Sequence, residues 1–279
     1  MLDQLLQVLT PRFVSEDVFI ADNMHPRAPR VFGGQVLAQA LRAAADTVPV
    51  ERAVHSQHAY FLRPGDPAES IRLEVDRALD GGSLSSRRVV ALQRGKAILV
   101  SSVSFQTAGA GDDYQRTAPE VPPPESLISE RQKALETGDF DDSFPLVTGE
   151  DLDVRMVTAV DWHNPQPLPP VLSAWVKTNG SLNQPDAVHA SLLAYFSDTL
   201  LIDVCLGATG RSYLRDDIQL ASLDHALWFH GPFRADEWLL HTVEAERVAA
   251  GRGLAHGRFY NRDGVLVASA SQQGLMRAR

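Results

Sequence analysis

The sequence predicts an α+β protein made of two similar halves, each with one helix followed by a run of long antiparallel strands. The chain has 279 residues and a 44% hydrophobic composition, which is enough for two domains with full cores. A segment rich in Gly, Pro and acidic residues, 106–146, lies between two stretches of strand character. Strand motifs also recur at one spacing, so we interpret the halves as copies of one unit.

Two pairs of matching segments define this repeat. HAYFLRP begins at His58 and HALWFHG at His225, while ILVSSVSFQ begins at Ile98 and VLVASASQQ at Val265. Both separations are 167 residues (225 − 58 and 265 − 98). Two matches at one offset favour duplication over chance similarity of short strands. We therefore predict an N-terminal domain over 1–107, an interdomain linker over 108–150 and a C-terminal domain over 151–279.

The first half begins with a short helix in MLDQLLQVLTPRF. Val31-Phe32-Gly33-Gly34-Gln35 then opens an Ala- and Leu-rich helix, and alternating patterns predict strands near 54–62, 69–79, 85–94 and 97–106. A short helix is expected in the linker, around 129–136.

In the second half, Asn183-Gln184-Pro185-Asp186 predicts a helix start with Pro near the first turn, and the helix continues through 187–198. Strands are predicted near 218–230, 236–247, 253–261 and 264–275. An apolar helix followed by long antiparallel strands indicates a sheet curled around that helix. This is a hotdog domain, and two such domains in tandem form a double hotdog whose sheets can pair.

The composition disfavours several classes of protein. A net charge of −9 disfavours a nucleic-acid surface, because a phosphate backbone requires a basic field. Cys205 is the only cysteine, and its apolar setting predicts a buried side chain without a reactive thiolate. The N-terminus lacks the basic region of a signal peptide, and no run approaches the roughly 18 apolar residues of a membrane span. We expect a soluble, cytoplasmic protein.

The sequence contains no G-x-S-x-G elbow, no H-E-x-x-H motif and no P-loop. Hydrolysis by this chain would therefore use a positioned water. Asp198 is a candidate for holding it, because Ala187, Ser191, Ala194 and Asp198 share one helical stripe. Small side chains along that stripe predict close packing, and an acid brought into such a contact must be paired or neutral.

The 167-residue offset aligns Gln272 with Phe105 and Ser222 with His55. The second half thus carries a small polar set where the first carries bulkier groups. Gln272 shares its strand face with apolar neighbours and needs a hydrogen-bonding partner there, whereas Gln273 points to the opposite face. We predict one working site per chain, contributed mainly by the second half.

Several segments in order resemble the acyl-CoA thioesterase II family, the TesB-like double-hotdog thioesterases. They are VFGGQVLAQAL, HSQHAYFLRPGDP, SSRRVVALQ, LAYFSDTLL, SLDHALWFH and DGVLVASASQQGLMR. In that family an Asp, a Thr or Ser, and a Gln hold the attacking water, and the motifs match them to Asp198, Ser222 and Gln272. The resemblance implies hydrolysis of fatty acyl-CoA in lipid metabolism, no metal or other cofactor, and a homodimer or higher homo-oligomer.

Other residues have weaker assignments. By analogy with hotdog enzymes, Gly33 and Gly34 are candidate oxyanion donors, although they equally suit a helix that enters close to the sheet. Arg63, Arg87 and Arg88 are candidates for the coenzyme A phosphates or for plain surface solubility, and Arg87 and Arg88 must point to opposite faces.

His58 and His225 are equivalent by the 167-residue offset, which favours a shared structural role. Two alternative functions remain at this stage: a hotdog hydratase acting on enoyl thioesters, and an acyl-CoA binding module without chemistry.

Overall fold

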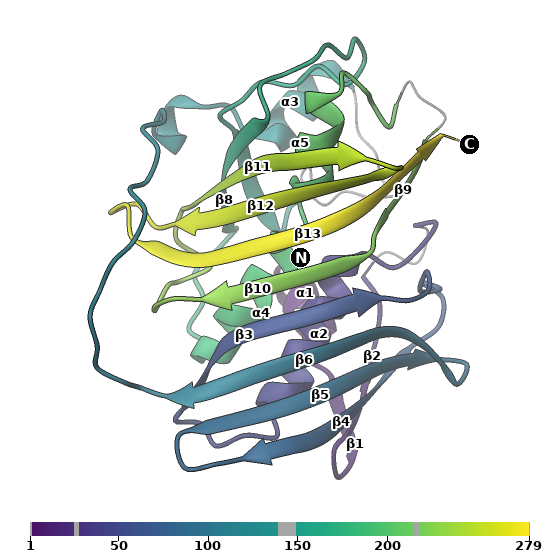
Figure 1. Ribbon diagram of the computed structural model, residues 1–279, viewed down its shortest axis with the longest axis vertical. Helices are drawn as coiled ribbons and strands as arrows, with labels where there is room; N and C mark the ends of the chain where they lie inside the picture. Colours follow the sequence, from purple (N-terminus) through teal and green to yellow (C-terminus); the bar gives the residue numbers. More distant parts are fainter. Residues whose placement is uncertain (1, 25–27, 139–148, 215–217, 279) are drawn as a thin grey trace.

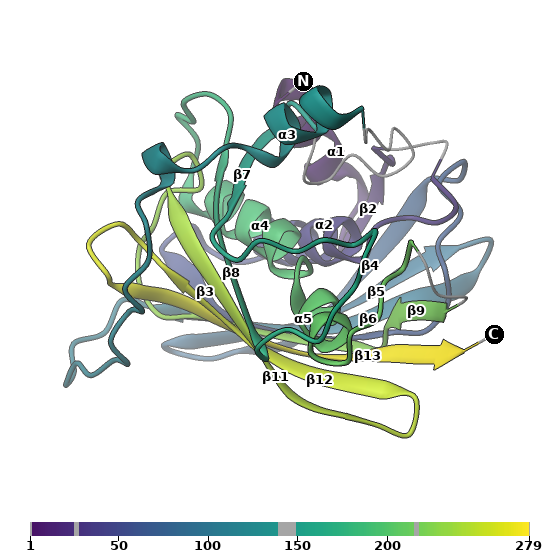
Figure 2. The same ribbon diagram turned by 90° about the horizontal axis from the view of Figure 1, so that it is seen from above.

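A computed structural model describes residues 2–24, 28–138, 149–214 and 218–278. One continuous 13-stranded antiparallel sheet curves around two neighbouring helices, α2 (Gly33–Ala45) and α4 (Asp186–Ser197) (Figures 1 and 2). The predicted double-hotdog fold, with a helix inside each half of a curved sheet, is confirmed.

The first half contains the predicted helix and all four predicted strands. Its elements are α1 (Leu2–Leu9), β1 (Arg12–Ser15), β2 (Val18–Ala21), α2, β3 (Arg52–Phe61), β4 (Ile71–Asp80), β5 (Leu84–Gln93) and β6 (Lys96–Thr107). The sequence did not predict β1 and β2, which are four residues each and form the edge of the sheet beside β4. Such short strands carry too few alternations to be recognised.

The second half contains strands that sequence patterns missed. Its elements are β7 (Leu152–Met156), β8 (Val171–Thr178), α4, α5 (Leu201–Ala208), β9 (Ile218–Ser222), β10 (Asp224–Phe229), β11 (Leu239–Ala249), β12 (Arg252–Tyr260) and β13 (Leu266–Ala278). The strand predicted over 218–230 is interrupted at Leu223, whose N–H donates to the Gln273 carbonyl. The interruption separates Ser222 on β9 from His225 on β10.

The two halves join in the middle of the sheet and in the middle of the core. Strand β3 pairs with β10, with Ala59 opposite His225, and α2 packs against α4. The helices approach closely because a Cβ atom at Gly34 would lie 2.5 Å from the carbonyl oxygen of Tyr195. Glycine at this position therefore brings the start of α2 against the end of α4.

Residues 186–208 are long and apolar enough to cross a membrane by length and composition alone, contrary to the expectation that no run of this length exists. In the structure this stretch is two helices, α4 and α5, separated at Leu200, where the backbone is left-handed with φ 66°. Because 72% of its apolar window is buried inside the protein, it forms the core of the C-terminal half.

The segment between the halves packs against the C-terminal half and runs along one side of the sheet (Figure 1). Gln115 donates to the Gly264 carbonyl and accepts from the N–H of Leu266. Further along, the Pro122 carbonyl accepts from the indole of Trp175 at 2.9 Å. The predicted helix is present as α3 (Glu130–Thr137), after a 3-10 turn, η1 (Pro124–Ser126). The predicted DFDDSFP part of the linker lies outside the described residues, and the domain boundaries stay predictions.

The gapless offset of 167 residues is wrong by one or two positions. The turn glycines Gly95 and Gly264 are 169 residues apart (264 − 95). The irregularity at His55 in β3 and the interruption at Leu223 are 168 apart (223 − 55). A gap between the matched segments therefore exists, and sequence similarity alone concealed it.

The corrected register changes the counterparts of two site residues. Gln272 corresponds to Val103 instead of Phe105, and Ser222 corresponds to Val54 instead of His55. Both valine side chains lack a hydrogen-bonding group. The polar set of the second half thus has apolar counterparts in the first.

Candidate active site

Asp198, Ser222 and Gln272 meet at one point, although they come from three elements. Asp198 follows the last residue of α4, Ser222 ends β9, and Gln272 lies in β13. Ser222 Oγ donates to Asp198 Oδ1 at 3.0 Å, and Gln272 Nε2 donates to Ser222 Oγ at 3.2 Å. The side chain of Gln272 is 1% exposed, while Asp198 and Ser222 are partly exposed. The cluster is therefore anchored inside the protein by Gln272, while Asp198 and Ser222 lie nearer the surface.

The strand register explains why these side chains converge. Gln272 faces the core, as predicted, together with Ala268 and Ala270. Ser222 is paired with Gly274, two residues from Gln272 on the same strand. Because residues two apart share a face, Ser222 and Gln272 project toward the same end of α4.

Burial raises the pKa of Asp198 to about 6. Hydrogen bonds from Ser222 and Gln272, a backbone hydrogen bond from Gly34 and the positive charge of Arg30 act in the opposite direction. The carboxyl group is consequently poised close to neutral pH, in the range that suits a general base. Burial, together with the charge of Asp198, also raises the pKa of Asp203 in the first turn of α5 to about 6.

Two residues of this cluster were not identified as site residues from the sequence. His225 Nδ1 lies 2.5 Å from Gln272 Oε1, and His225 Nε2 lies 2.9 Å from Ser197 Oγ. Both side chains are buried. The sequence predicts a structural role for His225 because the 167-residue offset pairs it with His58. Its position three residues after Ser222 is the one sequence feature that could have indicated a place in the site.

The shared role for His58 and His225 is wrong. His58 is exposed and packs its ring edge-on against Trp228, with centroids 5.0 Å apart. In the corrected register the counterpart of His225 is Gln57, which is buried and donates to the Leu37 carbonyl. The two histidines thus occupy opposite faces of the sheet.

Gly33 and Gly34 place the first turn of α2 against the acid. A Cβ atom at Gly33 would lie 2.5 Å from Asp198 Oδ2, and the backbone N–H of Gly34 is close enough to the carboxylate to lower its pKa. The close approach expected of these glycines is therefore present. The positive end of the α2 dipole points at the carboxylate and stabilises its charge.

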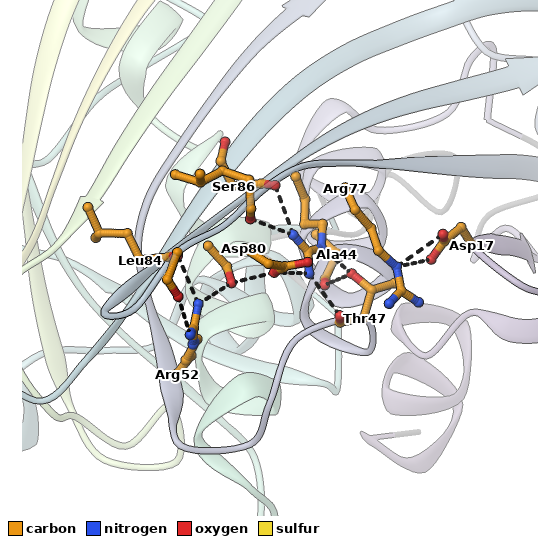
Figure 3. Close-up of polar contacts among 12 residues, drawn as sticks. Asp17, Ala44, Thr47, Arg52, Arg77, Asp80, Leu84 and Ser86 are labelled. Carbon is orange, nitrogen blue, oxygen red and sulfur yellow. Dashed lines mark hydrogen bonds and ion pairs between the residues drawn. The ribbon is translucent and has the colours of Figure 1, made fainter.

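Arg87 is in the wrong place for a coenzyme A phosphate. Its side chain is 1% exposed and its donors are used internally, by Thr47, Asp80 and the carbonyls of Leu79 and Ser86. Thr47, Asp80 and Ser86 belong to one polar cluster at the end of α2 (Figure 3). The alternation on β5 turned Arg87 inward, and a buried guanidinium is kept only with such partners.

The other candidate arginines remain accessible. Arg88 is exposed on the outer face of β5, and Arg63 is exposed with Nη1 donating to the Ala97 carbonyl at 2.7 Å. Neither contacts Asp198. Arg30, which the sequence did not single out, is exposed near the start of α2 and influences the Asp198 carboxyl through its charge.

Two small hollows lie near the two core helices. One is lined almost entirely by apolar groups at the end of α4 and the adjoining strands: Leu152, Val154, Ala174, Val176, Phe196, Thr199, Leu200 and His241. The other lies at the start of α2 and is lined by Asn23, Ala28, Arg30, Val31, Phe32, Gln35 and Pro67. One hollow is thus largely apolar, and the other carries the cation of Arg30.

Cys205 is buried, as predicted, and burial raises its thiol pKa to about 11. A thiol protonated at neutral pH is a poor nucleophile. Among the described residues, no group of three or more His, Cys, Asp or Glu side chains has the arrangement of a metal site.

Comparisons with known proteins match both halves. The family described as "Acyl-CoA thioesterase" matches residues 151–275, and the "Acyl-CoA thioesterase N-terminal domain" matches residues 20–106. The chain is 34% identical to Acyl-CoA thioesterase 2 of Haemophilus influenzae, over 99% of this chain and 98% of that protein.

Solved structures agree with these matches. The acyl-CoA thioesterase II TesB2 of Mycobacterium marinum superposes with a TM-score of 0.81 at 35% identity, covering 99% of this chain and 98% of that one. A protein with a hot dog fold from Alicyclobacillus acidocaldarius has a TM-score of 0.77 at 18% identity, covering 99% and 98%, and supports the fold alone.

Proposed function

Because this chain belongs to the acyl-CoA thioesterase family and is an acyl-CoA thioester hydrolase, we propose that it hydrolyses fatty acyl-CoA by direct attack of a water held at Asp198, Ser222 and Gln272. The observation that carries this proposal is the convergence of the three side chains: Ser222 Oγ lies 3.0 Å from Asp198 Oδ1 and 3.2 Å from Gln272 Nε2, although the three residues are far apart in the sequence. The residue Asp198 is half-buried, and donors anchor its carboxylate.

The reaction needs one group that takes a proton from the attacking water and later gives it to the leaving sulfur. Asp198 accepts the proton as the water oxygen bonds to the thioester carbonyl carbon. The tetrahedral oxyanion then collapses, the carbon–sulfur bond breaks, and the coenzyme A sulfur takes the proton from Asp198. The products are a free acid and a thiol, and the site returns to its starting charge.

The oxyanion requires N–H donors near Asp198. The first turn of α2 supplies them, since its backbone N–H groups have no partner within the helix and its dipole favours negative charge. The backbone N–H of Gly34 acts on the Asp198 carboxylate and lowers its pKa in the free protein. We therefore assign the oxyanion to the Gly33 and Gly34 turn, with the substrate carbonyl competing for the Gly34 donor.

The two hollows suggest how the substrate lies. The acyl chain would extend toward Phe196 and Leu200, where the small apolar hollow has to widen to admit it, and the coenzyme A side would extend past Arg30 at the start of α2. The thioester carbon then falls next to Asp198. Arg63 and Arg88 are further candidates for the phosphates, which lie at the outer end of coenzyme A.

Thiol release from acyl-CoAs of several chain lengths tests the reaction. We expect hydrolysis by the wild type and a loss of about 10²- to 10⁴-fold in kcat for Asp198→Asn, the usual range for removing a general base. Ser222→Ala and Gln272→Ala should each lose less, since each holds the water without accepting its proton. Full activity of Asp198→Asn, with an unchanged fold by circular dichroism, would place the base elsewhere.

A further inference from the structure

Five side chains form a continuous line of hydrogen bonds that ends at Asp198. Ser197 Oγ lies 2.9 Å from His225 Nε2, and His225 Nδ1 lies 2.5 Å from Gln272 Oε1. Gln272 Nε2 contacts Ser222 Oγ at 3.2 Å, and Ser222 Oγ contacts Asp198 Oδ1 at 3.0 Å. Ser197, His225 and Gln272 are between 0 and 1% exposed. Their hydrogen bonds are therefore settled among themselves and not by bulk water.

The charge on Asp198 fixes the direction of each bond. An ionised carboxylate only accepts, so the Ser222 hydroxyl donates to it. Ser222 Oγ then accepts from the NH₂ group of Gln272, and this turns Gln272 Oε1 toward His225. Because Oε1 is an acceptor, His225 must present an N–H at Nδ1.

The imidazole of His225 has one proton to place. Burial lowers its pKa to about 4, against smaller opposing effects from Gln272 and Asp224, so the ring is neutral near pH 7. Two other titratable groups lie at the cluster. Burial and the charge of Asp198 raise the pKa of Asp203, and burial and the charge of His225 lower the pKa of His241. A neutral ring protonated at Nδ1 has a bare Nε2, which accepts a hydrogen bond.

Ser197 supplies that hydrogen bond. Its Oγ lies 2.9 Å from both His225 Nε2 and the Ala194 carbonyl oxygen. The hydroxyl carries a single hydrogen, and only donation to the ring satisfies Nε2. We propose that His225 is the positioning residue that holds the Gln272 carboxamide with its NH₂ group toward Ser222 and Asp198, and that Ser197 supports the Nδ1–H form of the ring by donating to Nε2.

This inference rests on the proposed function, because the water that Gln272 helps to hold is the one assigned to Asp198. It also gives the line of hydrogen bonds two states. When Asp198 is protonated it can donate to Ser222, the amide can turn over, and His225 can carry its proton on Nε2 and donate to Ser197. Ser197 then donates to Ala194. The ionised base thus selects one amide orientation and one ring tautomer.

Nitrogen NMR of protein labelled with ¹⁵N in the histidine rings tests the tautomer without any activity measurement. His225 is assigned as the signal that disappears in His225→Asn. At pH 8 we expect Nδ1 to be protonated and Nε2 bare in the wild type, and this preference to be weakened but kept in Ser197→Ala, because the ionised Asp198 still fixes the Gln272 amide. A wild-type ring protonated at Nε2 at pH 8 would overturn the proposal, whether or not the enzyme turns over.

Kinetics test the consequence. His225→Asn retains an N–H near the Nδ1 position, whereas His225→Leu fills similar space without one. We expect His225→Leu to lower kcat by about ten- to a hundredfold, the usual effect of freeing one buried hydrogen-bonding group, with KM within about twofold. His225→Asn should recover most of the loss. Equal losses in both variants, or a change confined to KM, would contradict a role in orienting Gln272.

The pH profile separates positioning from general damage. In His225→Leu the Gln272 amide is no longer oriented, so the hydrogen bond by which Gln272 lowers the Asp198 pKa is lost. That pKa rises, and the acidic limb of kcat/KM should move to higher pH. A structural defect would lower the profile without moving it. His58→Leu, on the exposed face, is the matched control and should leave kcat and the limb unchanged. If His225→Leu does not fold, the NMR measurement of the wild-type His225 tautomer still tests the proposal.

Discussion

Gly33 at the start of α2 and Asp198 at the end of α4 are in direct contact, so that a Cβ atom at Gly33 would lie 2.5 Å from Asp198 Oδ2. The same Cβ would lie 3.0 Å from the ring of Phe61. Asp198, from the second half, thus lies against the start of α2 in the first half, close to the ring of Phe61 on β3. The site, although its three polar side chains come from the second half, is completed by the first.

Gly33→Ala should therefore reduce turnover. The new methyl group cannot be accommodated by Phe61, so the Asp198 side chain must move, and its hydrogen bond to Ser222 is strained or broken. We expect kcat to fall by about tenfold or more, since a displacement of about 1 Å in a catalytic group can cost a factor of about 100. Steady-state kinetics with one acyl-CoA measure this effect.

Gly82→Ala is the matched control, because a Cβ atom at Gly82 would meet nothing within 4 Å. It should leave kcat unchanged. A Gly33→Ala enzyme with wild-type kcat would show that the contact with Asp198 is not maintained in solution.

The pH profile of kcat/KM should have an acidic limb near pH 6. Asp198 must be ionised to accept a proton, and burial raises its pKa to about 6. Below that pH, kcat/KM should fall about tenfold per pH unit. Ser222→Ala removes a donor that lowers the pKa, so its limb should lie at higher pH than that of the wild type.

Ser83→Ala, an exposed serine in the turn before β5, should leave the limb in place. A wild-type limb near pH 4 would mean that Asp198 is not the group that titrates, and an unshifted limb in Ser222→Ala would mean that its hydrogen bond does not act on the carboxyl.

Two of the three candidate site residues are marked locally in the sequence, whereas Ser222 is matched through the family resemblance. Asp198 ends a stripe of small residues, and Gln272 lies on the apolar face of its strand. Neither pattern reveals that the two side chains meet, because that depends on β9 pairing with β13. The family resemblance supplied this information, and the structure places Ser222 between them.

His225 and Arg87 were misassigned for physical reasons. The counterpart of His225 depends on a hairpin turn and a strand interruption, neither of which alters the similarity of the motifs. Arg87 occupies an inward position on an alternating strand, and a single sequence does not show that Thr47 and Asp80 satisfy it there. Helix α5 was concealed because the apolar run continues through the left-handed break at Leu200.

Strand β8 escaped detection for a related reason. Its burial is nearly continuous from Leu172 to Val176 instead of alternating, because its outer face is covered by the segment that joins the halves. Trp175 on that face contacts Pro122 through its indole N–H. Alternation identifies a strand only when one of its faces meets water.

Asp198→Asn should make the protein more stable at pH 7. The carboxyl has a pKa of about 6 when folded against a reference value of 3.8. The folded protein therefore binds this proton more tightly, and stability is lost as the pH rises from about 4 to about 6. Asn avoids that loss, and we expect a gain of about 1–2 kcal/mol after allowance for the partial exposure of Asp198.

Chemical unfolding at pH 7 measures the free energy of unfolding for this comparison. Asp113→Asn, an exposed acid in the linker, is the control and should change it little. A less stable Asp198→Asn protein would indicate that the ionised carboxylate supports the fold through its donors more than its burial costs.

His241→Phe should remove part of the sensitivity of the fold to acid. His241 is 1% exposed and stacks on Phe259 with ring centroids 4.0 Å apart, and its Nε2 has no hydrogen-bond partner among the described residues. Burial lowers its pKa to about 3, from a reference value of 6.5. Below about pH 6.5 the His241 imidazole is therefore protonated in the unfolded chain but stays neutral in the folded protein. The free energy of unfolding falls as the pH is lowered through this range.

Phenylalanine preserves the stacking and takes up no proton. The difference in unfolding free energy between His241→Phe and the wild type should grow in favour of the variant by about 1.4 kcal/mol per pH unit between pH 6 and pH 4. The difference isolates one histidine, whereas the wild-type curve also contains Asp198 and Asp203, whose raised pKa values act in the opposite direction. Urea unfolding at pH 7, 6, 5 and 4 gives the slope, and a difference independent of pH would show that His241 is not held neutral by burial.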